Sequence, residues 1–591
     1  MPNPRGKRRG FRKKPAKPKP PRASFETLPS ELLLRIAEEF DPIQFMGSND
    51  APEGFCDVNE DGVEYYSQVL RSFCLASKTF FPIGKSILDT FWWEDRMKKE
   101  RESLIRKFIA NPAAAASIRA VSVTSNDETR DPCFRNVIEK DEIGKDLLSA
   151  AAKWVSMDSK SIWLQMLKTR EEDSLLVLLL SLLPNLEIIC FRVFLSLHAE
   201  YPWTLAYLRS NARQYLSMKI RNVISYFEND AGIASLLNLP SLRSIVLSQA
   251  WGRSRNEAHQ GGLTSSAPLR WTSPITWPRR ASNVERLVLE ECDVDPYFLA
   301  NIITACKGLK YFKYSWAEHG GDTAALDGLV RSLETQMETL ETLILDPAQS
   351  EGFGPMLTEP LAPLGSLKNF SKLRHVEMSA HIILGNPGYD GYSYYRNAEV
   401  WLARVFYRSA GASPASRNKG MGTVAAQLSI KPVGPLEYDH DPEPHFPDYA
   451  TIADMFPPSL ETLIVSDQGE GPVYFLPFLI RLAEKLSALG YDTPKPNPLP
   501  NLREIDISQR CYPPRKPDCV LALWFKLANS FSNVGVELVL PLGIRSRYME
   551  YLYKSSEEDD SYDEEDDAEY GGDGANSDGV DDDEDPYRDK I

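Results

Sequence analysis

Two stretches of this 591-residue sequence carry side chains at spacings that suit a bound metal ion. The first, "DVNEDGVEYYSQ" (57–68), has acidic or amide side chains at its first, third and fifth positions and glycine at its sixth, as calcium-binding loops do. Its twelfth residue is Gln68, where such a loop uses a bidentate glutamate. We therefore interpret this stretch as an acidic surface loop.

The second stretch, "DHDPEPH" (439–445), places His440 and His445 among carboxylates. Its two prolines hold it extended, so it does not present its ligands as one face of a helix would. The spacing supplies no third ligand either, although a protein metal site needs three or four. We expect no metal site and no other cofactor in this protein.

The residue patterns of common catalytic sites are missing from the sequence. It contains no G-x-S-x-G turn, no Walker-type glycine loop, and no dinucleotide fingerprint after a strand. No cysteine–histidine arrangement stands out by its spacing, and the eight cysteines include no C-x-x-C pair. The sequence therefore predicts no catalytic residues, a protein that is not an enzyme, and reduced cysteines in an intracellular compartment.

A six-residue phrase recurs along the middle of the chain and indicates how the fold is built. Each copy has apolar residues at positions 1, 4 and 6, as in "LEIICF" from Leu186 and "LETLIL" from Leu340. The other copies begin at residues 118, 242, 284, 309, 373, 460 and 502. Each copy predicts a short strand whose fourth and sixth residues point inward together, while the first anchors the preceding turn.

Amphipathic helical stretches such as 296–307 lie between these copies. One strand–helix unit cannot bury its own apolar side, whereas stacked neighbours share a continuous core. We predict an α/β fold in which residues 96–552 form an irregular repeat solenoid, with parallel strands on its concave face and helices outside. Insertions at 250–281 and 380–450 are candidate target-facing loops. The alternative is an ordinary α/β domain whose strands are similar by chance.

Both ends of the sequence are highly charged. Residues 1–22 hold ten Lys or Arg and no acid, while residues 557–591 hold eighteen Asp or Glu against two basic residues. Such segments cannot bury a core, so we predict disordered tails at 1–23 and 553–591. The basic tail fits nuclear import, weak nucleic-acid binding or a solubilising leader. No apolar run is long enough to span a membrane, so we expect a cytoplasmic or nuclear protein.

Ahead of the array, "LPSELLLRIAEEF" (28–40) predicts an amphipathic helix. Leu32, Ile36 and Phe40 form its apolar stripe, with Pro29 in the first turn. Leu34 lies off that stripe, about 200° around the helix from Leu32. The surplus apolar surface is either a docking site for another protein or extra core of the helix's own domain.

A second amphipathic segment, "LRSFCLASKTFFPIGKSILDTFWW" (70–93), follows after an acidic insertion at 41–69. Together the two segments resemble the F-box, in the form that precedes leucine-rich repeats in filamentous-fungal proteins. The resemblance covers residues 28–88 of a predicted domain at 24–95. It is carried by Leu28-Pro29, Glu31-Leu32-Leu33, Ile36 and the block "CLASK" (74–78) leading to Phe80.

The resemblance implies a small helical module that docks on the Skp-type adaptor of an SCF-type cullin–RING ubiquitin ligase. The repeats would then bind an unknown target protein, which makes the chain a substrate-recognition subunit. The adaptor-binding residues that it implies are Leu28, Pro29, Leu32, Leu33, Ile36, Leu75 and Phe80, the last two also packing the second segment. The alternative is a leucine-rich-repeat scaffold that recruits no ligase and contacts chromatin or histones through its charged tails.

Overall fold

The structure is a computed structural model of the whole chain. It describes residues 28–45, 60–93, 101–125, 144–155, 160–168, 172–193, 219–225, 236–248, 277–294, 296–316, 329–347, 364–379, 455–466, 498–508 and 527–540, with short pieces at 204, 206–208, 233–234, 251–252, 382–383, 479, 482–483, 486 and 524. Both predicted tails, the two histidines of 439–445 and nearly all of the 380–450 insertion lie outside the described residues.

The chain divides into two compact units, Met1–Pro541 and Leu542–Ile591, and every described residue belongs to the first. The predicted helical domain (24–95) and residues 96–541 of the predicted array (96–552) therefore share one compact unit. The predicted acidic tail begins at residue 553, within the second unit.

The first part of the chain is helical. Its elements are α1 (Ser30–Glu38), α2 (Pro42–Phe45), α3 (Glu60–Ala76), α4 (Phe80–Leu88), then strand β1 (Phe91–Trp93), α5 (Arg101–Ala110) and α6 (Pro112–Ser117). Strand β2 (Ala120–Ser125) is followed by three further helices, α7 (Lys145–Trp154), α8 (Lys160–Lys168) and α9 (Glu172–Ser181).

The rest of the chain is mainly strands with helices between them. The elements are β3 (Ile188–Val193), β4 (Asn222–Ser225), β5 (Ser244–Ser248), β6 (Trp251–Gly252), β7 (Arg286–Val294), α13 (Pro296–Ala305), β8 (Tyr311–Trp316), α14 (Leu329–Leu333), the short 3₁₀ helix η4 (Glu334–Gln336), β9 (Thr342–Pro347), β10 (His375–Ser379), β11 (Thr462–Ser466), β12 (Glu504–Asp506) and β13 (Glu537–Val539).

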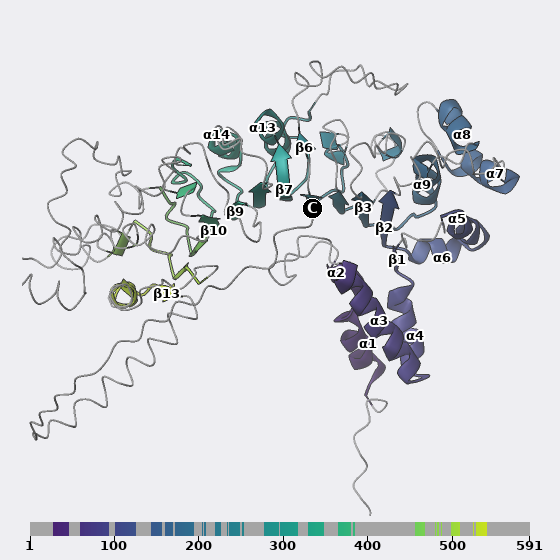
Figure 1. Cartoon of the computed structure of the whole chain (residues 1–591), viewed down its shortest axis with the longest axis horizontal. Helices are drawn as coiled ribbons and strands as arrows, with labels where there is room; N and C mark the ends of the chain where they lie inside the picture. The colour runs from purple at the N-terminus through teal and green to yellow at the C-terminus, as the bar shows by residue number, and fades with distance from the viewer. Residues whose placement is uncertain are drawn as a thin grey trace, which may run out of the picture. The chain divides into compact units, whose positions relative to one another are not determined.

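Twelve of the strands form one continuous sheet, in the order in which they occur along the chain (Figure 1). All of these pairings are parallel, and the remaining strand, β6, pairs with the end of β7. The sheet is open, with β1 and β13 at its two edges. The expected α/β fold with a parallel sheet is therefore confirmed.

The inward-pointing pair in each phrase is confirmed by burial. In β3, Ile189 and Phe191 are fully buried, and the fourth and sixth residues of the other phrases are buried in the same way. They are Val121 and Val123, Ile245 and Leu247, Leu287 and Leu289, Phe312 and Tyr314, Leu343 and Leu345, Val376 and Met378, Leu463 and Val465, and Ile505 and Ile507. These side chains share one face of the sheet because successive strand residues point to opposite faces.

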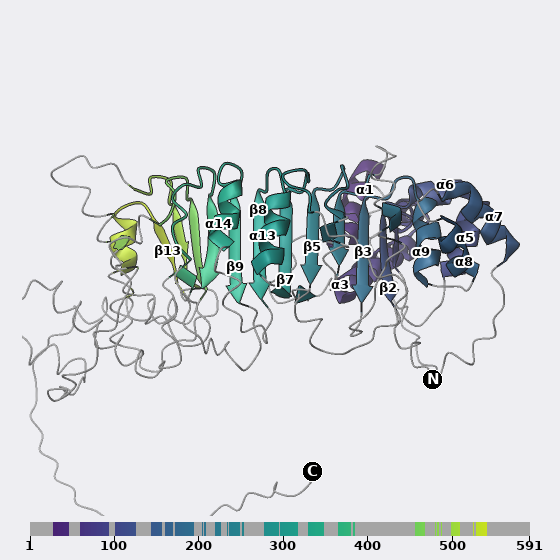
Figure 2. The same cartoon turned by 90° about the horizontal axis from the view of Figure 1, so that it is seen from above.

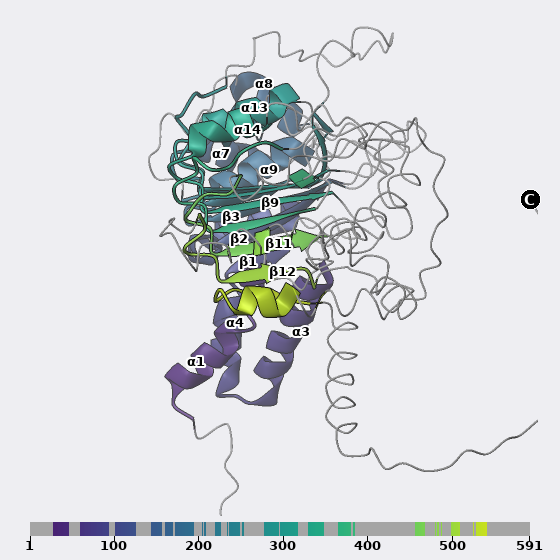
Figure 3. The same cartoon turned by 90° about the vertical axis from the view of Figure 1, so that its left-hand side faces the viewer.

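Helices cover this inner face, so the array has two layers. Figures 2 and 3 show α9, α13 and α14 along one side of the sheet. Every residue from Leu175 to Leu180 of α9 is buried. In α13, Phe298, Leu299, Ile302 and Ile303 are buried at helical spacing.

The continuous sheet contains three strands that lie outside the nine copies of the phrase, namely β1, β4 and β13. Strand β4 lies between β3 and β5, where the sequence "IRNVIS" has Ser225 instead of an apolar residue at position six. Strand β1 comes from the end of the segment that was expected to continue as helix. Conversely, β10 pairs directly with β11, so the insertion at 380–450 places no strand between these two in the sheet.

Polar side chains in the turns join each unit to the one before it. The residue ahead of a phrase donates a hydrogen bond to a carbonyl of the preceding turn at five places. These bonds are Asn185 Nδ2 to Ala116 O (2.7 Å), Ser241 Oγ to Ile220 O (2.7 Å), Asn283 Nδ2 to Pro240 O (2.8 Å), Ser459 Oγ to Leu373 O (2.8 Å) and Asn501 Nδ2 to Pro458 O (3.0 Å).

Gln336 makes the most enclosed of these connections. Its side chain is almost fully buried, and its Oε1 accepts a hydrogen bond from the Leu309 amide at 3.0 Å. Its Nε2 donates to the carbonyls of Ile303 (3.1 Å) and Cys306 (3.0 Å). One amide side chain therefore satisfies three backbone groups of the preceding unit, which would be costly to leave unpaired in the core.

Charged residues at the second position of the phrase form a row across the sheet. Three neighbouring pairs are ion pairs of opposite sign: Arg119 with Glu187 (3.1 Å), Lys310 with Glu285 (2.8 Å) and Arg374 with Glu461 (3.7 Å). These side chains are mostly exposed, so water and salt screen the charges and each pair adds little to the stability of the sheet.

We predict that Gln336→Leu destabilises the part of the sheet around β8 and β9 by about 2–4 kcal/mol, because three buried backbone groups lose their partner. Hydrogen–deuterium exchange of a peptide covering 303–312 should become at least roughly tenfold faster, since opening free energies govern exchange. The exposed neighbour Met337→Leu is the control and should leave exchange unchanged. Equal protection in Gln336→Leu and in the unsubstituted protein would contradict the prediction.

Candidate protein-interaction site

The candidate site lies on the helices of residues 28–88, which we call the helical module. Its core contains Ala37 from α1, Leu70 from α3 and Ile87 from α4, all buried. Partly buried side chains pack around these three, namely Phe40, Phe73, Ile83 and Leu88. The module thus has an apolar core of its own, to which α1, α3 and α4 contribute.

Helices α3 and α4 approach closely because α4 carries a glycine where they meet. A Cβ atom on Gly84 would lie 2.6 Å from Cys74 Sγ and 3.2 Å from the Phe73 ring. The Phe73 and Phe80 rings stack beside this point, with centroids 4.6 Å apart. Burial raises the pKa of the Cys74 thiol, so the group stays neutral and packs as a small apolar side chain.

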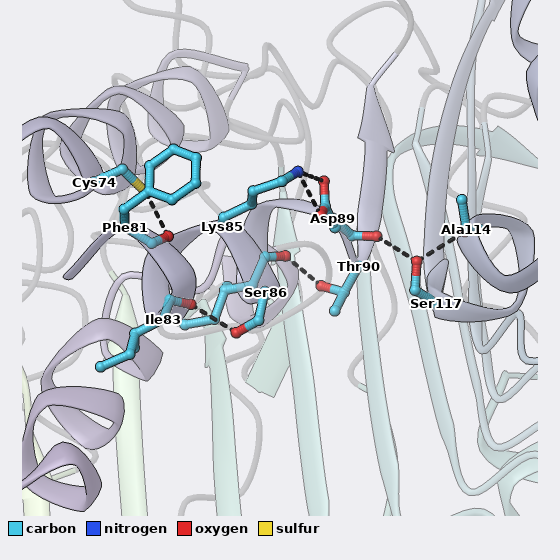
Figure 4. Close-up of polar contacts among 10 residues, drawn as sticks. Cys74, Phe81, Ile83, Lys85, Ser86, Asp89, Thr90, Ala114 and Ser117 are labelled. Atoms are coloured by element: carbon cyan, nitrogen blue, oxygen red, sulfur yellow. Dashed lines mark hydrogen bonds and ion pairs between the residues drawn. The ribbon is translucent and has the colours of Figure 1, made fainter. Parts of the chain in front are cut away.

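Polar contacts hold the two ends of α4 (Figure 4). At its start, Cys74 Sγ donates a weak hydrogen bond to the Phe81 carbonyl at 3.7 Å. At its end, Lys85 Nζ pairs with Asp89 at 2.7 Å, and Ser117 Oγ donates to the Asp89 carbonyl at 3.1 Å. The last contact ties α4 to the turn that precedes β2.

Helix α1 buries a narrow stripe and exposes apolar side chains on both sides of it. Leu33 and Ala37 form the buried stripe, four residues apart. Leu32 is 47% exposed, and Leu34 is also exposed. Because each residue advances about 100° around a helix, these two leucines flank Leu33 on opposite sides. The surplus leucine of this helix is therefore surface and not core.

Two more large apolar side chains are exposed where α3 leads into α4. Leu75, next to the last residue of α3, is 86% exposed, and Phe81, in the first turn of α4, is 51% exposed. Only a short connection separates them, so they lie at the same end of this helix pair. Exposed apolar side chains that gather on one small module are typical of a protein-binding surface.

The structure divides the residues that the F-box resemblance implies into two groups. Leu32, Leu75 and Pro29 are exposed, while Leu28 and Ile36 are partly buried. Leu33 (1% exposed) and Phe80 (7% exposed) are buried within the module. Leu34 and Phe81 are exposed although the sequence reasoning did not include them. The doubled "FF" at 80–81 is the available signal, because these adjacent residues point about 100° apart around the helix and only Phe80 lies on its buried side.

The acidic insertion expected at 41–69 contains two helices, which corrects that prediction. Helix α2 occupies Pro42–Phe45, and α3 begins at Glu60. Residues 60–68 of the calcium-loop stretch are therefore helical and cannot wrap around an ion as a binding loop does. Residues 46–59, with the first three positions of that stretch, lie outside the described residues.

The helical module is joined to the sheet by backbone and apolar contacts. The Thr90 carbonyl accepts hydrogen bonds from Arg119 N (2.6 Å) and Ala120 N (3.2 Å), which starts the pairing of β1 with β2. From α2, Ile43 packs against an apolar cluster on the sheet face opposite the inner one. That cluster consists of Ala120, Ile188, Cys190, Ile224, Val246 and Val288.

Within the described ranges, no group of three or more His, Cys, Asp or Glu side chains is arranged to hold a metal ion. Four cysteines of this part, Cys74, Cys190, Cys292 and Cys306, are buried thiols without disulfides, and burial raises the pKa of Cys306 to about 12. None of the described helices is both long and apolar enough to cross a lipid bilayer. A scan of the chain against protein-family models and a search of curated proteins give no match.

We predict that Gly84→Val destabilises the helical module by about 1–3 kcal/mol, because the added side chain must displace Cys74 or separate α3 from α4. Faster hydrogen exchange in α3 and α4 measures the effect. Ser86→Val, on the exposed side of the same helix, introduces the same side chain without this contact and should cost only a few tenths of a kcal/mol. Equal effects of the two substitutions would show that the close helix approach is unimportant.

Proposed function

We propose that this protein is a substrate-recognition subunit of an SCF-type cullin–RING ubiquitin ligase. The helical module would be an F-box that binds the Skp-type adaptor. The observation that carries the proposal is the exposure of Leu32, Leu75 and Phe81 on a module whose core is complete without them. Leaving such side chains in water forgoes roughly 1.5–3 kcal/mol each, which burial against a partner would recover.

We propose further that the sheet and its covering helices form an irregular leucine-rich-repeat array. Two observations support this: the phrase that repeats from strand to strand, and the turn side chains that bond to the preceding unit. Repeat arrays offer an extended surface assembled from many units, which suits binding of a protein target. The target would be captured there, and the adaptor at the helical module.

The mechanism of such a subunit is proximity. Binding the adaptor and the target at once raises the effective concentration of the target's lysines near the ubiquitin-loaded enzyme. The bond-making chemistry takes place on other subunits, so this chain needs no catalytic side chain of its own. It contributes to the rate by fixing where the target is held.

Adaptor binding tests the proposal. We predict that Leu32→Asp combined with Leu75→Asp weakens binding of purified Skp-type adaptor by roughly 100-fold or more, because each residue is exposed in the free chain and would be desolvated in the complex. Titration of tagged full-length protein with the adaptor, followed by calorimetry or pull-down, measures the change. Both positions are exposed, so the thermal midpoint should move little.

A matched control comes from outside the module. Ile162 of α8 is an exposed apolar side chain of the same kind, and Ile162→Asp should leave adaptor affinity unchanged. The proposal fails if the folded, unsubstituted protein binds no adaptor, or if the double variant binds as tightly as the parent. Retained binding of DNA through residues 1–22 in a chain that binds no adaptor would instead favour a chromatin-contacting scaffold.

A further inference from the structure

We call the sheet face opposite the helices the outer face. Its side chains change from apolar near β1 to polar and charged near β13. It carries the alternate strand residues, those between the inward-pointing pairs. Toward β1 it is apolar, because the cluster from Ala120 to Val288 lies here with Ile43 packed against it. Toward β13 it is polar and charged, and the two regions meet at β7 and β8.

At β7 and β8 the charges on the outer face are paired with one another. Lys313 Nζ lies 3.1 Å from Glu290 Oε1. The Arg286 guanidinium lies over the Tyr311 ring, 4.7 Å from its centroid. Each cation of this region therefore has an anionic or aromatic partner within the sheet itself.

From β10 to β13 the outer face is acidic. Its described residues include four carboxylates and no Lys or Arg, and apolar side chains lie between the carboxylates. Burial lowers the pKa of His375, so this imidazole adds no positive charge at neutral pH. We call this region the β10–β13 face; it consists of His375, Glu377, Thr462, Ile464, Glu504, Asp506, Glu537 and Val539.

On the β10–β13 face, carboxylates lie opposite one another without forming ion pairs of the kind found at the three places in the second-position row. In the row at the second phrase position, neighbouring charges of opposite sign form the ion pairs described above. Here Glu504 and Glu537 are direct partners in the ladder and have the same sign. Like charges directly opposite one another destabilise a sheet, and a cationic partner would remove that cost.

We propose that the basic segment of residues 1–22 of this same chain docks on the β10–β13 face. Charge complementarity favours this occupant, because the segment carries ten Lys or Arg and no acid. Its Phe11, within "RRGFRKK", would pack beside the half-buried Ile464. The contact does not depend on adaptor binding, and it would cover part of the surface on which a target is expected to bind.

The reach of the segment is sufficient. Residues 1–27 span up to about 90 Å when extended, at about 3.4 Å per residue. Ile43 packs on the outer face beside β2 and β3, and eight strand spacings of about 4.8 Å separate β3 from β12, a distance of about 40 Å. From Leu28, where the described chain begins, Lys7 can reach about 71 Å and Lys14 about 48 Å, so about 30 Å and about 8 Å of chain respectively remain to pass the helical module. Tethering also gives the segment an effective concentration that a free peptide would lack.

Zero-length carbodiimide crosslinking of the full-length protein, read by mass spectrometry, tests the proposal. The reagent joins a lysine to a carboxylate only when the two form a contact. We expect crosslinks from Lys7, Lys13 or Lys14 to Glu504, Asp506 or Glu537 at low salt, and at least a fivefold loss at 0.5 M salt, where exposed charges are screened. Absence of these crosslinks, or tail crosslinks confined to residues 557–591, would overturn it.

Two controls sharpen the experiment. Glu504→Gln with Glu537→Gln should reduce tail crosslinks to Asp506 at least fivefold, because the face loses two negative charges. The thermal midpoint should not fall, because the double substitution also removes a like-charge pair. Glu31→Gln with Glu39→Gln, exposed carboxylates of the helical module, should leave them unchanged. Mixing isotope-labelled and unlabelled protein identifies the source, since mixed-label crosslinks would assign the contact to a second copy and overturn the intramolecular proposal.

Discussion

The fold depends on stacking of the inward-pointing apolar pairs from one strand to the next. Ile189 and Phe191 of β3 are fully buried because β2 and β4 continue the same layer on either side and α9 covers it. Each fully buried side chain of this size contributes roughly 1.5–3 kcal/mol, but only while both neighbours are in place. At the far edge, Leu538 of β13 has one neighbouring strand and is only partly buried.

Apolar stacking does not by itself align one unit with the next, and buried polar groups supply that alignment. Hydrophobic contact is non-directional, whereas a hydrogen bond requires a donor and an acceptor at defined places. Asn283 and Asn501 bond to the equivalent carbonyl of the unit before, Pro240 in one case and Pro458 in the other. Gln336 does the same inside the core, with three bonds to one turn.

The strands with a complete phrase could be predicted from sequence, because apolar residues at positions four and six are sufficient to mark an inner face. Strand β4 could not, since Ser225 replaces the second apolar residue and only Val223 remains of the pair. The exposed leucines of α1 were only partly predictable. Periodicity identified an apolar stripe, but Leu32 and Leu33 both fit it, and only the folded module shows that Leu33 is the buried one. The β10–β13 face required the register of strands far apart in the sequence.

The charged row at the second phrase position bears on how the strands find their order. Strands with nearly the same apolar pattern are interchangeable as far as the core is concerned, so a chain of this kind risks pairing a strand with the wrong neighbour during folding. If β3 were skipped, Arg119 would meet Arg221; if β8 were skipped, Glu285 would meet Glu341. In these two mispairings like charges would repel, whereas the native order gives attraction at three places and places like charges together where Arg221 lies beside Arg243. Exposed charges that add little to the stability of the finished sheet can thus discriminate among the ways of assembling it.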